Sequence, residues 1–133
     1  MLECLILGDS IGVGLGMVRH GCETHAKVGI NSRDWNRAWL HRGLDADRVI
    51  ISLGSNDWDP RITREELIRL RDEVRSAHVT WIIPAIKPQM RAVVMELAMQ
   101  HGDAMVDLRS VSLGPDGVHP TNRGYHDIDG MIR

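Results

Sequence analysis

The sequence has no apolar stretch of about 18 residues, the minimum that a membrane-spanning helix needs. Its N-terminus also lacks the basic segment and the long apolar segment of a secretory signal peptide. Residues 2–7 are better explained as a first buried strand. From the sequence we therefore expect a cytoplasmic or assembly-associated protein.

Cysteine is scarce, with only Cys4 and Cys22 in the chain. Two cysteines are too few to predict a disulfide framework, and the absence of a CxxC pair gives no support to a zinc site. Cys4 stands in an apolar run, so we expect it to be an ordinary core residue. This pattern is compatible with a reducing compartment.

An excess of positive charge is also missing. The chain has 16 Lys and Arg against 18 Asp and Glu, a net charge of −2 at pH 7, and both signs are spread along it. A protein that binds nucleic acid or an anionic membrane usually concentrates positive charge in one region. We therefore expect the protein to bind neither nucleic acid nor a membrane. The sequence does not indicate an oligomeric state.

The 133 residues, of which 43% are hydrophobic, show no internal repeat or linker. This length predicts a single domain over residues 1–133 with its own core. Short apolar runs alternate with helical patterns. The runs predict buried strands at residues 2–7, 24–28, 48–53, 79–83 and 104–108. The helical patterns lie at residues 11–20, 32–42, 63–77, 87–100 and 120–132.

Several helix ends are indicated by capping residues. Ser32 is the expected N-cap of the second helix, Thr63 and Glu66 form a capping-box pattern at the third, and Gly102 ends the fourth. Trp35 and Trp39 are four residues apart on the second helix. That spacing predicts a core-facing stripe rather than a sugar-binding platform.

Strands that are apolar on both faces and separated by helices are typical of parallel sheets. With right-handed crossovers, the pattern predicts a three-layer α/β/α sandwich around a five-stranded parallel sheet, a flavodoxin-like arrangement. Binding and catalytic sites of such sheets form beyond the carboxyl ends of the strands. The loops that follow the strands are therefore where a site is expected.

These loops carry the residue types that acyl transfer needs. Ser10 follows the first strand, Asn56 follows the third, and Asp116 and His119 stand in the last long loop. A serine hydroxyl becomes a useful nucleophile when a histidine takes its proton and a carboxylate orients that histidine. Backbone N–H groups and an asparagine amide can then stabilise the oxyanion.

In order and position, these blocks resemble the SGNH hydrolase superfamily, the GDSL-like esterases and lipases. Residues 8–10 (GDS), Gly29, residues 54–57 (GSND) and residues 116–120 (DGVHP) match its four blocks. The resemblance implies the SGNH hydrolase fold, with no metal or organic cofactor. It makes Ser10 the nucleophile, His119 the base and Asp116 its orienting partner. The implied oxyanion hole combines the N–H groups of Ser10 and Gly29 with the Asn56 amide.

The expected substrate is a small-molecule or glycan ester with a short acyl group, acetyl above all. A chain this short has little length left for a lid or a deep acyl tunnel once the sheet and its helices are built. Asp57 and Trp58 directly follow Asn56 and are candidate substrate-binding residues. A tryptophan at this position is equally compatible with packing the loop.

Other interpretations of the same residues fit less well. Residues 8–12 match the GxSxG elbow of α/β-hydrolases, but that fold needs several strands before its serine. The glycines at 12, 14 and 16 do not have dinucleotide-loop spacing, and His126 with Asp127 lacks the spacing of a metal site. A non-catalytic binding domain, or an accessory domain of a larger assembly, is the alternative, since fold alone does not separate it from an enzyme.

Overall fold

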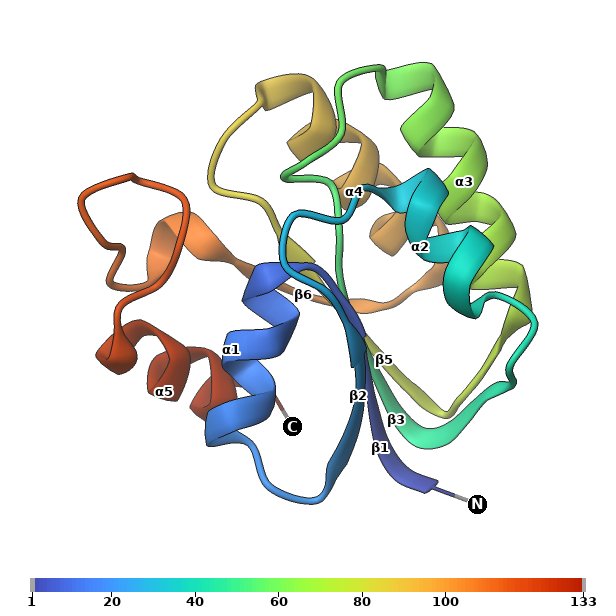
Figure 1. Cartoon of the computed structure of the whole chain (residues 1–133), viewed down its shortest axis with the longest axis horizontal. Helices are drawn as coiled ribbons and strands as arrows, with labels where there is room; N and C mark the ends of the chain where they lie inside the picture. The colour runs from blue at the N-terminus through green and yellow to red at the C-terminus, as the bar shows by residue number, and fades with distance from the viewer. Residues whose placement is uncertain (1, 133) are drawn as a thin grey trace.

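The computed structural model describes residues 2–132 and shows a twisted parallel sheet with helices on both faces (Figure 1). The main sheet has the strand order β2-β1-β3-β5-β6, and a short β4 pairs with the start of β3. Every strand pair is parallel, which confirms the predicted five-stranded sheet and adds β4 to it. The strands are β1 (Leu2–Gly8), β2 (Cys22–Ala26), β3 (Leu44–Ser52), β4 (Val74–Arg75), β5 (His78–Ile83) and β6 (Ala104–Asp107).

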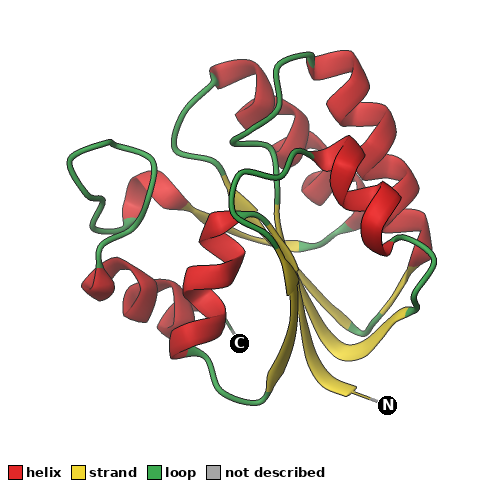
Figure 2. Cartoon of the chain, in the orientation of Figure 1, coloured by secondary structure: helices red, strands yellow, loops and turns green. Residues whose placement is uncertain are grey.

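The helices divide between the two faces of the sheet (Figure 2). One face is covered by α1 (Ser10–Val18) and α5 (Asn122–Met131). The other is covered by α2 (Ser32–Trp39), α3 (Pro60–Glu73) and α4 (Pro88–His101). A single 3₁₀ turn, η1 (Leu108–Ser110), follows β6. This is the three-layer sandwich that the sequence predicts.

The central strands fill a core on each side of the sheet. Along β1, Leu5 and Leu7 pack toward α2, α3 and α4, whereas Ile6 packs toward α1 and α5. All three are fully buried, and each such side chain contributes roughly 1.5–3 kcal/mol. Trp35 is also fully buried and contacts the partly buried Trp39 at 5.5 Å between ring centroids, so the predicted core stripe on α2 is confirmed.

Two predicted N-caps are wrong by one to four residues. The N-cap of α2 is Asn31, whose side chain accepts a hydrogen bond from Asp34 N at 2.8 Å, and Ser32 is the first helical residue. Helix α3 begins at Pro60 with Asp59 as its N-cap, so Thr63 lies inside the helix. Proline is favoured at a first helical position, and this signal outweighs the capping-box pattern further on.

The end of α3 also differs from the prediction. The helix stops at Glu73 instead of continuing to residue 77, because Val74 and Arg75 pair with Leu44 and Asp45 of β3. The predicted end of α4 is confirmed: Gly102 adopts the left-handed conformation with φ +67°.

The two cysteines form a disulfide, which corrects the prediction of an unlinked core cysteine. Cys4 of β1 and Cys22 of β2 are register partners, and their Cα atoms lie 4.3 Å apart. Cys4 is buried as expected, but it is covalently tied to the neighbouring strand. The pairing of β1 with β2 is what brings these residues together, and the local sequence does not show it.

Within residues 2–132, no helix combines the length and hydropathy that crossing a membrane would require.

Candidate active site

The carboxyl ends of β1, β2 and β3 lie side by side, and the candidate residues follow them. Gly8 is the register partner of Ala26 on one side and of Ser52 on the other. A Cβ atom at Gly8 would lie 2.6 Å from the Ser52 carbonyl oxygen, so a side chain would force β1 away from β3. Glycine therefore allows the strands to stay together immediately before Ser10.

Ser10, His119 and Asp116 form a continuous hydrogen-bonded line. Ser10 Oγ lies 2.7 Å from His119 Nε2, and His119 Nδ1 lies 2.6 Å from Asp116 Oδ2. Ser10 is the first residue of α1, whereas the other two stand in the loop before α5. The fold thus places these side chains as the sequence predicts, from segments more than 100 residues apart.

Asp116 has two tasks in this loop. Its Oδ1 accepts hydrogen bonds from the backbone N–H groups of Val118 and His119, at 2.9 and 3.0 Å, while Oδ2 faces the imidazole. These bonds lower the pKa of Asp116 to about 2; the largest cause is the His119 backbone N–H, followed by the imidazole and the Val118 N–H. The carboxylate therefore stays ionised. It fixes the backbone turn at residues 116–119 and the orientation of the His119 imidazole.

Asp9 stabilises the start of α1, where Ser10 lies, and no sequence pattern above predicts this role. It is the N-cap of α1 and is completely buried. Its Oδ1 accepts hydrogen bonds from Ile11 N at 3.0 Å and from Ser52 Oγ at 3.4 Å, while its buried Oδ2 has no partner within residues 2–132. Burial raises the pKa of Asp9 to about 6. An Asp between a strand and a helix is an N-cap signal that would have identified this role.

Several potential oxyanion donors follow the carboxyl ends of β1, β2 and β3. The Ser10 N–H is the first of α1, where helices leave their N–H groups without intrahelical partners. Asn56 Nδ2 donates one hydrogen bond to the Ile30 carbonyl at 3.0 Å, which leaves its second N–H for a ligand. Gly29 is exposed, with φ +80°, in the turn just before Ile30. The Asn56 bond therefore ties the Gly29 turn to the loop after β3.

Asp57, which lines two cavities beside Trp58, turns its carboxylate toward protein groups, and its role in binding substrate stays a prediction. One carboxylate oxygen accepts a hydrogen bond from Ser32 N at 2.9 Å, and the other accepts one from Thr63 Oγ1 at 2.7 Å. Its backbone carbonyl accepts a hydrogen bond from Lys87 Nζ at 2.8 Å. Asp57 joins the starts of α2 and α3 and holds the Asn56 loop in place.

Trp58 points outward and is 85% exposed. Lys87 Nζ lies 3.7 Å from the centroid of its ring, a cation–π contact. Lys87 has φ +58°, a left-handed conformation that is costly for a residue other than glycine. This conformation accompanies the contacts of Lys87 with both Trp58 and the Asp57 carbonyl. The indole is thus an oriented platform beside Asn56.

Two small cavities adjoin Trp58. One, of about 180 Å³, is lined by residues that include Asn31, Arg33, Asn56 and Ile62. The other, of about 190 Å³, is formed by Trp58 with the start of α4. Among residues 2–132 there is no group of three or more His, Cys, Asp or Glu side chains arranged to hold a metal ion.

No protein-family model and no curated protein matches the sequence. Solved structures do match. An aryl esterase of M. smegmatis aligns with a TM-score of 0.62 at 17% identity, covering 99% of this chain and 100% of that one. A carbohydrate acetylesterase of Sinorhizobium meliloti aligns with a TM-score of 0.65 at 15% identity. The alignment covers 98% of this chain and 97% of that one.

A third structure is the C-terminal catalytic domain of the Streptococcus pneumoniae peptidoglycan O-acetyltransferase, with a methylsulfonyl adduct. It aligns with a TM-score of 0.65 at 16% identity and covers 98% of this chain and 91% of that one. The three structures share the SGNH hydrolase fold. The chain therefore has the SGNH hydrolase fold, as its motifs predict.

Proposed function

We propose that this protein is a serine esterase that removes short acyl groups through an acyl-enzyme on Ser10. The observation that carries the proposal is the hydrogen-bonded line from Ser10 Oγ through His119 to Asp116. Three groups of these types, in this order and at these distances, form the arrangement that activates serine nucleophiles in unrelated folds. A purely binding domain has no need of it.

The mechanism follows from the orientation of His119. With its Nδ1–H donated to Asp116, the imidazole presents Nε2 to Ser10. Nε2 takes the hydroxyl proton as Oγ attacks the ester carbonyl, and then gives it to the departing alcohol. Water next attacks the acyl-enzyme: its proton goes to Nε2, the carboxylic acid leaves, and Ser10 recovers its proton. Asp116 stays ionised throughout, in agreement with its low pKa.

The oxyanion would be held by three donors that are present before substrate binds: the N–H groups of Ser10 and Gly29 and the free N–H of Asn56. The positive end of the α1 dipole adds to this stabilisation at Ser10. Donors fixed in advance cost no reorganisation during the reaction, so each contributes on the order of 2.7–4 kcal/mol to the transition state.

The size of the cavities supports a short acyl group. Each buried CH₂ contributes about 0.8 kcal/mol, so a preference for long chains requires an enclosed apolar tunnel. The two cavities beside Trp58 are only about 180 and 190 Å³, and the side chains of His119 and Asp116 are about half exposed. Water reaches such an open site easily, which favours hydrolysis over transfer to another alcohol. We assign acetyl as the preferred acyl group.

Trp58 supports a carbohydrate as the alcohol part of the ester. Its exposed indole offers an apolar face of the kind on which sugar rings pack, directly next to Asn56. A carbohydrate acetylesterase and a peptidoglycan O-acetyltransferase are among the proteins of similar fold. For the location, the Cys4–Cys22 disulfide favours an oxidising compartment over the cytoplasm that the sequence suggests.

The test combines a covalent probe with an acyl series. A fluorophosphonate should add once to the wild-type protein and not to Ser10→Ala, while Ser76→Ala, at the opposite end of the sheet, should be labelled normally. The kcat/KM for p-nitrophenyl esters should be highest for acetate and fall toward octanoate. Unlabelled, folded wild-type protein would favour the binding-domain alternative, and a kcat/KM that rises to octanoate would contradict the acetyl assignment.

A further inference from the structure

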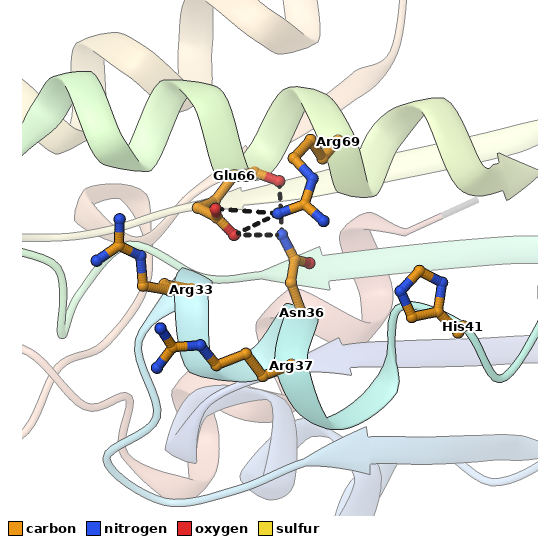
Figure 3. Close-up of a pocket in the computed structure, with 6 residues that line it drawn as sticks. All are labelled: Arg33, Asn36, Arg37, His41, Glu66 and Arg69. Atoms are coloured by element: carbon orange, nitrogen blue, oxygen red, sulfur yellow. Dashed lines mark hydrogen bonds and ion pairs between the residues drawn. The ribbon is translucent and has the colours of Figure 1, made fainter.

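A basic groove lies between α2 and α3, outside the site described so far (Figure 3). Its volume is about 420 Å³, and it is lined by Arg33, Asn36, Arg37, His41, Glu66 and Arg69. Three arginines and one glutamate thus line the groove, and Asp34 pairs with Arg37 beside it, in a chain whose net charge is −2. The groove is therefore more positively charged than the protein as a whole, whose net charge is negative.

Two of the three guanidinium groups are available to a ligand. The Glu66 carboxylate is occupied by Asn36 Nδ2 at 2.9 Å and by Arg69 at 3.2 Å, so Arg69 is already paired. Arg33 makes no ion pair within residues 2–132. Among these same residues Arg37 pairs only with Asp34, at 3.3 Å, and both side chains are more than half exposed. Exposed pairs of this kind contribute little, so an incoming anion can replace Asp34 at small cost.

The groove adjoins the cavity of about 180 Å³ beside Trp58. Arg33 lines both of them, so it stands between the indole and Arg37. Figure 3 shows Arg33 and Arg37 extending from α2 toward the same side. Asp59 also lines the cavity of about 180 Å³, and its negative charge disfavours an anionic group on that side of Trp58. Lys87 lies over the Trp58 ring, and on the side of Trp58 that faces α2 the cation that lines the cavity is Arg33.

We propose that the groove binds carboxylate groups of an acidic saccharide, and that the natural substrate is an acetylated acidic glycan. This proposal rests on the esterase function proposed above and specifies its substrate class. The acetyl ester would lie at Ser10, one sugar ring on Trp58, and carboxylates of neighbouring sugars at Arg33 and Arg37. Arginine suits this role because its planar fork of donors matches a carboxylate in two parallel hydrogen bonds.

The experiment compares two acetylated substrates of equal length, an oligogalacturonide that carries carboxylates and a neutral xylo-oligosaccharide. The measured quantity is the ratio of their kcat/KM values. The wild-type protein should favour the acidic substrate about 10-fold, because charge-assisted hydrogen bonds at a partly exposed site contribute on this scale. The preference should weaken as NaCl rises from roughly 0.05 to 0.5 M, because salt screens exposed charges.

The double variant Arg33→Gln/Arg37→Gln should lose most of this preference through a higher KM for the acidic substrate. Arg61→Gln is the matched control, since Arg61 is an exposed arginine of α3 that lines neither cavity. It should keep the wild-type ratio. A wild-type ratio near one, or a preference that survives in the double variant, would overturn the proposal.

A binding measurement separates this proposal from the esterase proposal. Unacetylated oligogalacturonide is titrated into Ser10→Ala and into Ser10→Ala/Arg33→Gln/Arg37→Gln by calorimetry. Binding that depends on the two arginines supports the groove even where wild-type protein fails to hydrolyse p-nitrophenyl acetate. Hydrolysis of p-nitrophenyl acetate without any binding of the acidic glycan would retain the esterase and refute the groove.

Discussion

Asp9 places a carboxyl group in the protein interior one residue before Ser10. Its pKa of about 6 lies above the ordinary value of 3.8, so the folded protein holds a proton that the unfolded chain releases between these values. The unfolded state then binds fewer protons, and the free energy of unfolding falls as pH rises from 3.8 through 6. A difference of about 2 pKa units lowers the free energy of unfolding by about 3 kcal/mol once the pH is above 6.

Asp9→Asn should remove this pH dependence. The amide oxygen of the variant can still accept the hydrogen bond from Ile11 N. Its NH₂ group would take the place of Oδ2 and would also lack a partner, so the variant should recover only part of the free energy that burying the Asp9 charge costs. We expect the variant to be more stable than wild type by about 1–2 kcal/mol at pH 8 and not at pH 4. Urea unfolding from pH 4 to 8 measures the difference, and parallel stability curves would contradict the raised pKa.

Asn56 is predicted to act on the transition state. Asn56→Ala should lower kcat by a factor on the order of 10²–10³ with little change in KM, as the loss of a single oxyanion donor does. The variant also loses the bond to the Ile30 carbonyl, which should lower the free energy of unfolding by about 1 kcal/mol. Steady-state kinetics and urea unfolding separate the two effects. A loss confined to KM would make Asn56 a substrate-binding residue.

At the scale of elements, α5 connects the His119 loop to the helix that carries Ser10. A Cβ atom at Gly14 of α1 would lie 2.2 Å from the Tyr125 ring of α5, so the absence of a side chain lets the helices approach. Arg19, the C-cap of α1, also bonds Asp129 of α5 at 2.7 Å. Burial raises the pKa of Tyr125, and the charges of Asp9 and Asp116 raise it further.

Gly14→Ala should therefore displace α5 and the His119 loop with it. We expect a loss of roughly 1–3 kcal/mol from overpacking, together with a fall in kcat. Gly130→Ala is the matched control on α5, because a Cβ there meets nothing within 4 Å and alanine is the better helix former. Activity and thermal unfolding should change in Gly14→Ala and stay at or above wild type in Gly130→Ala. Equal behaviour of the two would show that the α1–α5 contact does not position His119.

The elements also show how far the sequence alone leads. Local patterns predict the parallel sheet and the meeting of Ser10 with His119, because strand ends gather at one edge whatever the details. They do not show that Asp57 bonds Ser32 and Thr63, since this depends on how α2 and α3 approach one another. The basic groove is not predictable from the sequence for the same reason. Taken one at a time, its arginines are ordinary solvated charges, and only the packing of two helices makes neighbours of Arg33, Arg37 and Arg69.

At the scale of the whole molecule, the disulfide is the one covalent link between strands. It joins residues 18 apart in the sequence, and closing a loop of this length restricts the unfolded chain by about 3 kcal/mol. Cys4→Ala/Cys22→Ala, or reduction of the wild type, should lower the Tm by roughly 6–12 °C. The kcat should change little, because Cys22 begins β2 whereas Ser10 follows the opposite end of β1. Calorimetry with and without reductant tests this, and an unchanged Tm would contradict it.

The same bond makes the segment from Cys4 to Cys22 a covalent ring, and Ser10 is a member of that ring. A protease that cuts the backbone once inside it opens the ring but releases no fragment, so the nucleophile stays attached to the rest of the chain. The nicked protein would keep its mass, increased by one water, and would separate into two pieces only after reduction. Local opening of α1 is restrained in the same way, because the two ends of its loop cannot drift apart while the strands remain joined.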